Sequence, residues 1–95
     1  MTKLDAAQVT RELSSLADWT REGDTIVRRA KLPTFPDAIA FTVKLAFEAE
    51  AADHHPDLTI SYRSVTISYS THSEGGLTEK DFEGARTVDR LLSSW

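Results

Sequence analysis

Between positions 58 and 71 apolar side chains recur at every second residue, but the phase of this alternation changes halfway. The apolar residues before and after the change are Leu58, Ile60 and Tyr62, then Val65, Ile67 and Tyr69. Because side chains alternate across a β-strand, a change of phase predicts that one strand ends and the chain turns back. We therefore predict a β-hairpin with its turn at Arg63-Ser64.

A second hairpin is predicted earlier in the chain, from Trp19 to Leu32. Its centre, Glu22-Gly23-Asp24, is typical of a turn, and Ile26 and Val27 begin the returning strand. Two hairpins supply four strands, and this arrangement favours an antiparallel sheet.

Helical patterns precede, separate and follow the two hairpins. The spacing of apolar residues predicts helices over residues 5–16, 35–54 and 78–92. The first and last helices begin with capping boxes, which pair Asp5 with Gln8 and Thr78 with Asp81. The order helix-hairpin-helix-hairpin-helix predicts an α+β fold in which three helices pack on one face of a four-stranded antiparallel sheet. With 95 residues, the chain is expected to form one domain, residues 1–95.

The longest predicted helix has an unusual inward face. The stripe expected to face the sheet consists of Ile39, Val43, Ala46 and Phe47. At about 100° per residue, Glu50 and His54 fall on the same stripe. Taken alone, Glu50 is typical of a solvated helix position, and His54 of a residue near the negative end of a helix. Together, a carboxylate and an imidazole four residues apart on an inward face are candidates for chemistry.

Composition narrows the class of function. Fifteen acidic residues outnumber 11 basic ones, and the net charge of −4 disfavours binding to nucleic acid or to an anionic membrane. The absence of cysteine excludes disulfides, thiolate catalysis and cysteine-ligated metals. Neither a signal-peptide pattern nor a bilayer-spanning apolar run is found. We therefore expect a soluble, cytoplasmic protein with no membrane partner.

All three histidines lie close together in the sequence, at positions 54, 55 and 72. A helix end, a strand end and the start of the last helix can meet at one rim of the domain, where they would gather His54, His72 and Asp81. Imidazoles that titrate near neutral pH, with carboxylates to orient them, are typical of an acid–base site.

A metal site is the lesser alternative, because adjacent histidines do not provide the i, i+4 pair of an HExxH motif. Motifs for a serine nucleophile elbow or a phosphate-binding loop are absent.

The spacing of these residues resembles the signature of the pterin-4a-carbinolamine dehydratases. The matching positions are Glu50, His54-His55-Pro56, Tyr62, His72 and Asp81. The segment STHSEGGLTEKD and Trp19 agree with the same family, and the similarity covers essentially the whole chain. Two positions depart from the family pattern: Leu58 stands where many members have Trp, and Gly84 where a bulkier apolar residue is common.

The resemblance implies a hydro-lyase. Its substrate would be a 4a-hydroxytetrahydropterin, which loses water to give quinonoid dihydropterin, so that the pterin of aromatic amino acid hydroxylases is recycled. The resemblance implies no metal and no other cofactor. It implies His54 and His72 as an acid–base pair on opposite sides of the pterin, and His55 as a third catalytic residue that orients it. The implied substrate-binding residues are Glu50, Asp81 and Trp19, with the two carboxylates fixing histidine tautomers or binding pterin nitrogens.

The same resemblance implies an alternative function and a mode of assembly. Some relatives are binding modules, either dimerisation cofactors of a transcription factor or enzyme-assembly factors. The assembly factors tend to lose motif histidines, whereas this chain keeps all three. Relatives form homodimers or homotetramers, which agrees with the open edges of a small sheet. No direct contact with nucleic acid is implied.

Overall fold

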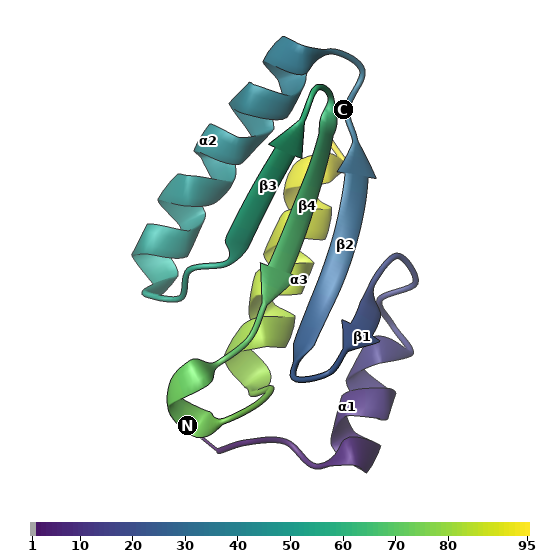
Figure 1. The fold of residues 1–95 in the computed structure, drawn as a ribbon, viewed down its shortest axis with the longest axis vertical. Coiled ribbons are helices and arrows are strands. Elements are labelled where there is room, and N and C mark those ends of the chain that lie inside the picture. Colours follow the sequence, from purple (N-terminus) through teal and green to yellow (C-terminus); the bar gives the residue numbers. More distant parts are fainter. Residues whose placement is uncertain (1) are drawn as a thin grey trace.

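The computed structural model describes residues 2–95. Its sheet is antiparallel throughout, with the strand order β1-β2-β4-β3 (Figure 1). The strands are β1 (Thr20–Glu22), β2 (Thr25–Lys31), β3 (Asp57–Ser61) and β4 (Ser64–Tyr69). The two predicted hairpins are therefore present, and pairing of β2 with β4 joins them into one sheet.

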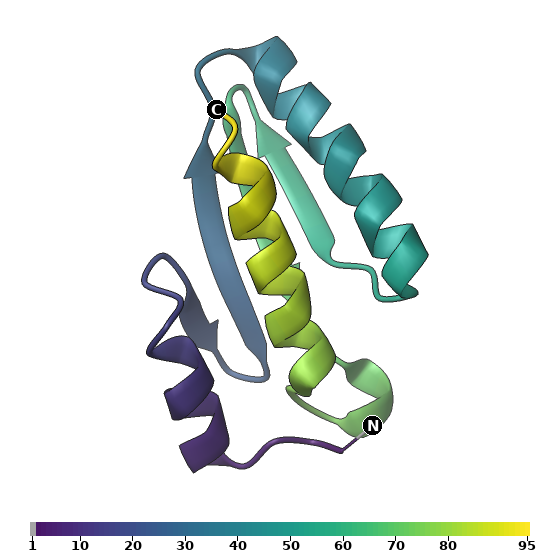
Figure 2. The same ribbon diagram turned by 180° about the vertical axis from the view of Figure 1, so that it is seen from behind.

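Three α-helices accompany the sheet, together with a short 3-10 helix. They are α1 (Ala6–Leu13), α2 (Phe35–Ala52), η1 (His72–Glu74) and α3 (Glu79–Leu92). Figure 2 shows α3 lying across the middle of the sheet, with α2 beside β3 and α1 beside β1. The predicted α+β fold, with three helices and a four-stranded antiparallel sheet, is confirmed. No helix within residues 2–95 combines the length and the apolar character needed to cross a membrane.

The core lies between the sheet and the helices. The alternation in β4 directs Val65, Ile67 and Tyr69 toward the helices, and all three are buried. Phe41 and Leu45 of α2 are completely buried in the same cluster. From α3 the cluster receives Phe82, Ala85 and Val88. The opposite side chains of β4, which are serines and threonine, are only partly buried, so the sheet has one apolar and one polar face.

The turn between β3 and β4 lies at Tyr62-Arg63, one residue earlier than predicted. Ser61 pairs with Ser64, and this register leaves two residues in the loop. Two-residue hairpin loops favour left-handed backbone conformations because these match the twist of the strands. Tyr62 adopts such a conformation, with φ of 54°, although it is not glycine. The sequence offered no glycine or asparagine to mark this position.

The predicted inward face of α2 is wrong. Ile39, Val43 and Phe47 are 38%, 50% and 74% exposed, and Ala46 is also exposed. The residues that face the core are instead Ala38, Phe41, Leu45 and Ala49. The helix carries two apolar stripes, and periodicity alone does not decide which one meets the sheet. The structure buries the stripe with small residues at both ends, and this face packs against α3.

Two predicted helix ends are also too late. Helix α1 ends at Leu13 rather than Leu16, since the hydroxyls of Ser14 and Ser15 bond back to backbone carbonyls and compete with helical hydrogen bonding. Helix α2 ends at Ala52 rather than His54, because Asp53 adopts a left-handed conformation with φ of 52° and ψ of 42°. This second change determines the geometry of the site.

Candidate functional site

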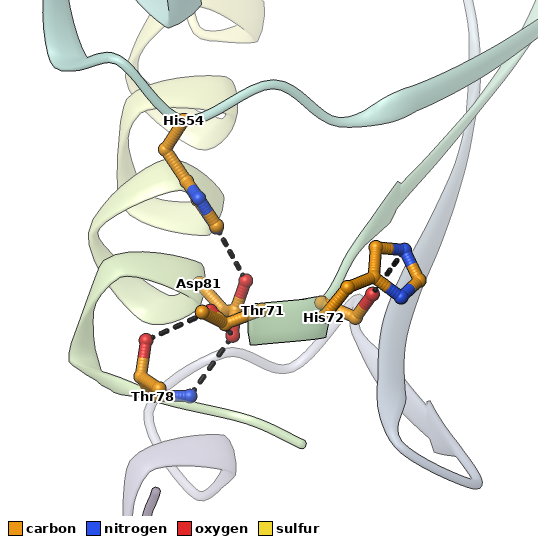
Figure 3. Close-up of polar contacts among 6 residues, drawn as sticks. His54, Thr71, His72, Thr78 and Asp81 are labelled. Atoms are coloured by element: carbon orange, nitrogen blue, oxygen red, sulfur yellow. Dashed lines mark hydrogen bonds and ion pairs between the residues drawn. The ribbon is translucent and has the colours of Figure 1, made fainter. Parts of the chain in front are cut away.

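A buried carboxylate holds one imidazole at the rim where α2, β4 and α3 meet. His54 Nε2 lies 2.6 Å from Asp81 Oδ1 (Figure 3). The Asp81 side chain is fully buried, and that of His54 is 13% exposed. His54 reaches this position because the backbone reverses at Asp53, whereas Asp81 lies in the first turn of α3. The predicted gathering of a helix end and a helix start is thus observed for this pair.

The second oxygen of Asp81 is also fully engaged. Asp81 Oδ2 accepts hydrogen bonds from the Thr71 hydroxyl at 2.8 Å and from the Thr78 backbone N–H at 2.9 Å. The hydroxyls of Thr71 and Thr78 lie 2.9 Å apart, and both residues are buried. Thr78 and Asp81 form the predicted capping box of α3. Asp81 therefore caps a helix and orients an imidazole at the same time.

Tyr69 supports the other side of His54 and was not singled out from the sequence. The two rings are stacked, with centroids 5.6 Å apart and planes inclined by 18°. Burial, and then the negative charge of Asp81, raise the pKa of the Tyr69 phenol from 10.0 to about 12. The tyrosine is therefore a neutral platform for the imidazole at physiological pH.

The signal that could have revealed Tyr69 is Gly84, a glycine in the middle of α3. A Cβ atom at position 84 would lie 2.5 Å from Cζ of Tyr69, so the tyrosine ring occupies the space of the missing side chain. This explains one of the two departures from the family pattern. Beside the ring, a pocket of about 160 Å³ opens between α2 and α3, and His54, Tyr69 and Gly84 contribute to its lining.

A second carboxylate–imidazole pair lies on the surface. His55 Nε2 is 2.7 Å from Glu50 Oε1, and the two side chains are 58% and 80% exposed. The expectation that Glu50 and His54 share an inward face is wrong. Glu50 belongs to the exposed side of α2, and the left-handed Asp53 turns His54 away from the helical path, so Glu50 meets His55 instead.

His72 lies at the start of η1 and is exposed. Its Nε2 is 3.3 Å from the Ser70 hydroxyl. In Figure 3 its ring points away from Asp81, whereas the ring of His54 points toward it. Among residues 2–95, no hydrogen bond joins His72 to His54 or His55. Its membership of the site remains a prediction.

Trp19, predicted to bind substrate, lies in the core. It is 4% exposed, and its indole N–H donates to Asp89 in α3 at 2.9 Å. Its ring centroid is 6.3 Å from that of Tyr69. Trp19 therefore supports the tyrosine on which His54 rests, and a direct contact with substrate remains a prediction.

The chemistry available at this rim is proton transfer. Two imidazoles are each oriented by a carboxylate, and a third lies one residue beyond Thr71. Within the described part of the chain, no three histidine, aspartate or glutamate side chains converge on a point that could hold a metal ion. The structure thus gives no support to the alternative metal site.

Comparison with known proteins gives this arrangement a family. Residues 2–91 match the family model described as pterin 4 alpha carbinolamine dehydratase. A relative from Roseiflexus sp. (strain RS-1) is 50% identical over 91 residues, which cover 96% of this chain and 98% of the relative. Another from Nocardia farcinica is 48% identical over 88 residues, covering 93% of both chains. Both carry the provisional name pterin-4-alpha-carbinolamine dehydratase.

Solved structures show the same fold. A protein from Brucella melitensis, described as a transcriptional coactivator/pterin dehydratase, superposes with a TM-score of 0.91 at 32% identity, covering 95% of this chain and 98% of that one. A pterin dehydratase-like protein described as a RuBisCO assembly factor of the alpha-carboxysome shares the fold at a TM-score of 0.63 and 22% identity, covering 77% of this chain and 84% of that one. The sequence match, its coverage and the common fold together place this chain in the pterin 4 alpha carbinolamine dehydratase family.

Proposed function

We propose that the protein dehydrates a 4a-hydroxytetrahydropterin to quinonoid dihydropterin. In this reaction the C4a–OH bond breaks as an acid protonates the departing hydroxyl, and a base removes the proton from N5, so that only water leaves. No electron transfer is needed. The observation that carries the proposal is the imidazole of His54, held at the rim by a buried carboxylate and open to solvent over part of its surface.

The proposed roles combine what the family resemblance implies with the surroundings of each side chain. His54 and His72 act as the acid–base pair, one on either side of the pterin ring. His55 and its partner Glu50 are exposed, so both are accessible to bind and orient the substrate's polar edge. Asp81 is fully buried and contacts His54 directly, and both observations support a role in positioning that imidazole.

The test uses the purified full chain in a phenylalanine hydroxylase reaction. Decay of the carbinolamine absorbance is followed, and the uncatalysed rate is subtracted. Removal of a general acid or base slows catalysis by roughly 10²–10⁴-fold, so His54→Ala and His72→Ala should each show a loss of this size. Lys31→Ala, at the far end of β2, is the control and should behave like the wild type. Wild-type rates in both histidine variants would remove the assignment.

The second candidate function is a binding or assembly module. The descriptions of the two solved relatives, one a coactivator/dehydratase and one an assembly factor, keep it in view. The presence of His54, His55 and His72 favours catalysis. The same assay separates the two functions, because a binding module should leave the carbinolamine decay unchanged even at stoichiometric concentration.

We further propose that the chain forms a homo-oligomer. Phe35, Ile39, Val43 and Phe47 recur every four residues along α2, and all four are exposed. Such a stripe is typical of helices that pair. Strand β3 pairs only with β4 among residues 2–95, so its other edge is open to a second sheet. Light scattering tests the proposal: Phe47→Glu should lower the particle mass, and a monomeric wild type would contradict it.

A further inference from the structure

We infer that a chain of hydrogen bonds through Thr78, Thr71 and Asp81 fixes the tautomer of His54, so that Nδ1 is the nitrogen that exchanges protons with a ligand. The catalytic part of this inference rests on the proposed function, whereas the tautomer itself does not. Thr71 and Thr78 are then positioning residues that act through Asp81.

The direction of each hydrogen bond follows from the donors available. An amide N–H can only donate, so Asp81 Oδ2 is an acceptor for Thr78 N–H. The Thr71 hydroxyl also donates to Oδ2. Its single proton is thereby used, and the Thr78 hydroxyl must supply the proton shared across the 2.9 Å separation of the two threonines. Both threonine hydroxyls are ordered in one direction, toward the carboxylate.

This order determines where the proton between Asp81 and His54 lies. No proton is left for Oδ2, so the remaining question is whether Oδ1 or Nε2 carries one. Imidazole is the stronger base of the two groups, and two hydrogen bonds to Oδ2 stabilise the charged carboxylate further. The proton therefore stays on Nε2, which donates to Oδ1 over 2.6 Å.

The other ring nitrogen remains available. In neutral His54, a proton on Nε2 leaves the lone pair on Nδ1. Within residues 2–95 the bond to Asp81 is the only side-chain hydrogen bond that His54 makes. The residue also lines the pocket between α2 and α3 and is partly exposed. Nδ1 can therefore take a proton from a ligand, and the imidazolium so formed can return it from the same atom.

Thr71 is well placed to position His54 through Asp81. It is 8% exposed, and its backbone exchanges hydrogen bonds with Gly76 across a short bridge. Its side chain bonds to the partner of His54, while its backbone continues directly into His72. Thr71 thus links the carboxylate that holds His54 to the start of the segment that carries His72.

The sharpest test is Asp81→Asn. The two donors, Thr71 hydroxyl and Thr78 N–H, will hold the amide oxygen on their side, so the amide NH₂ will face His54. An NH₂ group cannot accept, and His54 must then move its proton to Nδ1. Long-range ¹⁵N–¹H NMR on the ¹⁵N-histidine-labelled full chain, recorded at a pH at which the spectrum of His54 is that of a neutral ring, distinguishes the two tautomers.

We expect the Nε2–H form in the wild type and the Nδ1–H form in Asp81→Asn, with a rate loss as large as that of His54→Ala. In Asp81→Asn/Thr71→Val, one of the two orienting donors is missing, so the spectrum should contain both tautomers. Asp81→Asn/Thr71→Ser restores the hydroxyl and should return a single Nδ1–H form. Thr66→Val, which removes a hydroxyl from the polar face of β4, is the matched control and should keep the wild-type spectrum and rate.

Two results would overturn the inference: a wild-type His54 protonated on Nδ1, or an Asp81→Asn variant that keeps its proton on Nε2. If Asp81→Asn does not fold, the wild-type spectrum still decides the first point. In that case the single variant Thr71→Val, in which valine has nearly the same shape as threonine, is used in place of Asp81→Asn. Loss of one hydrogen bond to the carboxylate should reduce the rate about tenfold at unchanged KM, with recovery in Thr71→Ser. An unchanged rate would contradict the role of Thr71. The wild type could also show the expected tautomer but fail to accelerate dehydration. That result would contradict the proposed function and leave the tautomer assignment intact.

Discussion

The two carboxylate–imidazole pairs have nearly the same length but very different surroundings. The N–O distance is 2.6 Å in His54–Asp81 and 2.7 Å in His55–Glu50. Asp81 is fully buried and accepts three hydrogen bonds, whereas Glu50 is 80% exposed and accepts one. The comparison teaches that distance alone does not measure the contribution of a carboxylate–imidazole pair. Burial and the number of supporting donors decide it.

The difference has a simple physical origin. Water solvates both members of the exposed pair, so separating them costs little, and such pairs contribute about 0–1 kcal/mol. The buried pair has lost that solvation, and removal of one member leaves the others unsatisfied. The exposed pair can therefore rearrange around a ligand, whereas the buried pair is held in one geometry.

The largest loss of stability is expected when the buried pair is broken. Asp81→Ala leaves His54 Nε2, the Thr71 hydroxyl and the Thr78 N–H without an acceptor. A buried donor without a partner costs about 1–3 kcal/mol, so we expect the free energy of unfolding, measured by urea denaturation, to fall by about 3–5 kcal/mol. The matched variant Glu50→Ala, at the exposed pair, serves as the control. Equal losses in the two variants would show that burial does not separate the pairs.

Alkaline pH should destabilise the fold through Tyr69, the residue that stacks on His54. The pKa of Tyr69 is about 12 in the folded protein and 10.0 as its ordinary value. Between these values the unfolded chain has released the phenolic proton and the folded chain has kept it. Stability should therefore be complete below pH 10 and fall by about 1.4 kcal/mol per pH unit up to about pH 12. Urea titrations at several pH values measure this slope. Tyr69→Phe should reduce it, and an identical slope in that variant would contradict the assignment to Tyr69.

A methyl group at position 84 tests the platform under His54. Gly84→Ala places a Cβ atom against the ring of Tyr69, and overpacking of this kind costs about 1–3 kcal/mol. The gain in helix propensity of roughly 1 kcal/mol offsets part of that cost. The double variant Gly84→Ala/Tyr69→Leu should lose less stability than the two single changes predict together. Additive losses would show that the two positions do not compete for space.

The smallest expected effect concerns the exposed pair. Glu50→Gln keeps the shape of the side chain and removes its charge. The free energy of unfolding, measured by thermal denaturation, should change by no more than about 0.5 kcal/mol. If His55 orients substrate through this pair, KM should rise while kcat is largely kept. A stability loss as large as that of Asp81→Ala would place the two pairs in the same class.

Much of the fold could be predicted from the sequence because it depends on local patterns. Alternation with a change of phase predicted the β3–β4 hairpin, and capping residues predicted the starts of α1 and α3. The inward face of α2 was predicted wrongly, since a helix with two apolar stripes needs its tertiary partner to decide between them. The pairing within the site was missed for a similar reason. It depends on one left-handed residue, Asp53, which no glycine or asparagine marks.

The joining of His54 to Asp81 has a consequence for how the protein folds. The two residues are 27 positions apart, and the β3–β4 hairpin lies between them. The pair is therefore a non-local contact, which no single helix or hairpin can form by itself. Neither α2 nor the hairpin alone contains the pair, so the imidazole acquires its carboxylate only when the start of α3 docks. Formation of the His54–Asp81 contact during refolding therefore reports the docking of the start of α3 beside the end of α2, not the formation of the sheet alone.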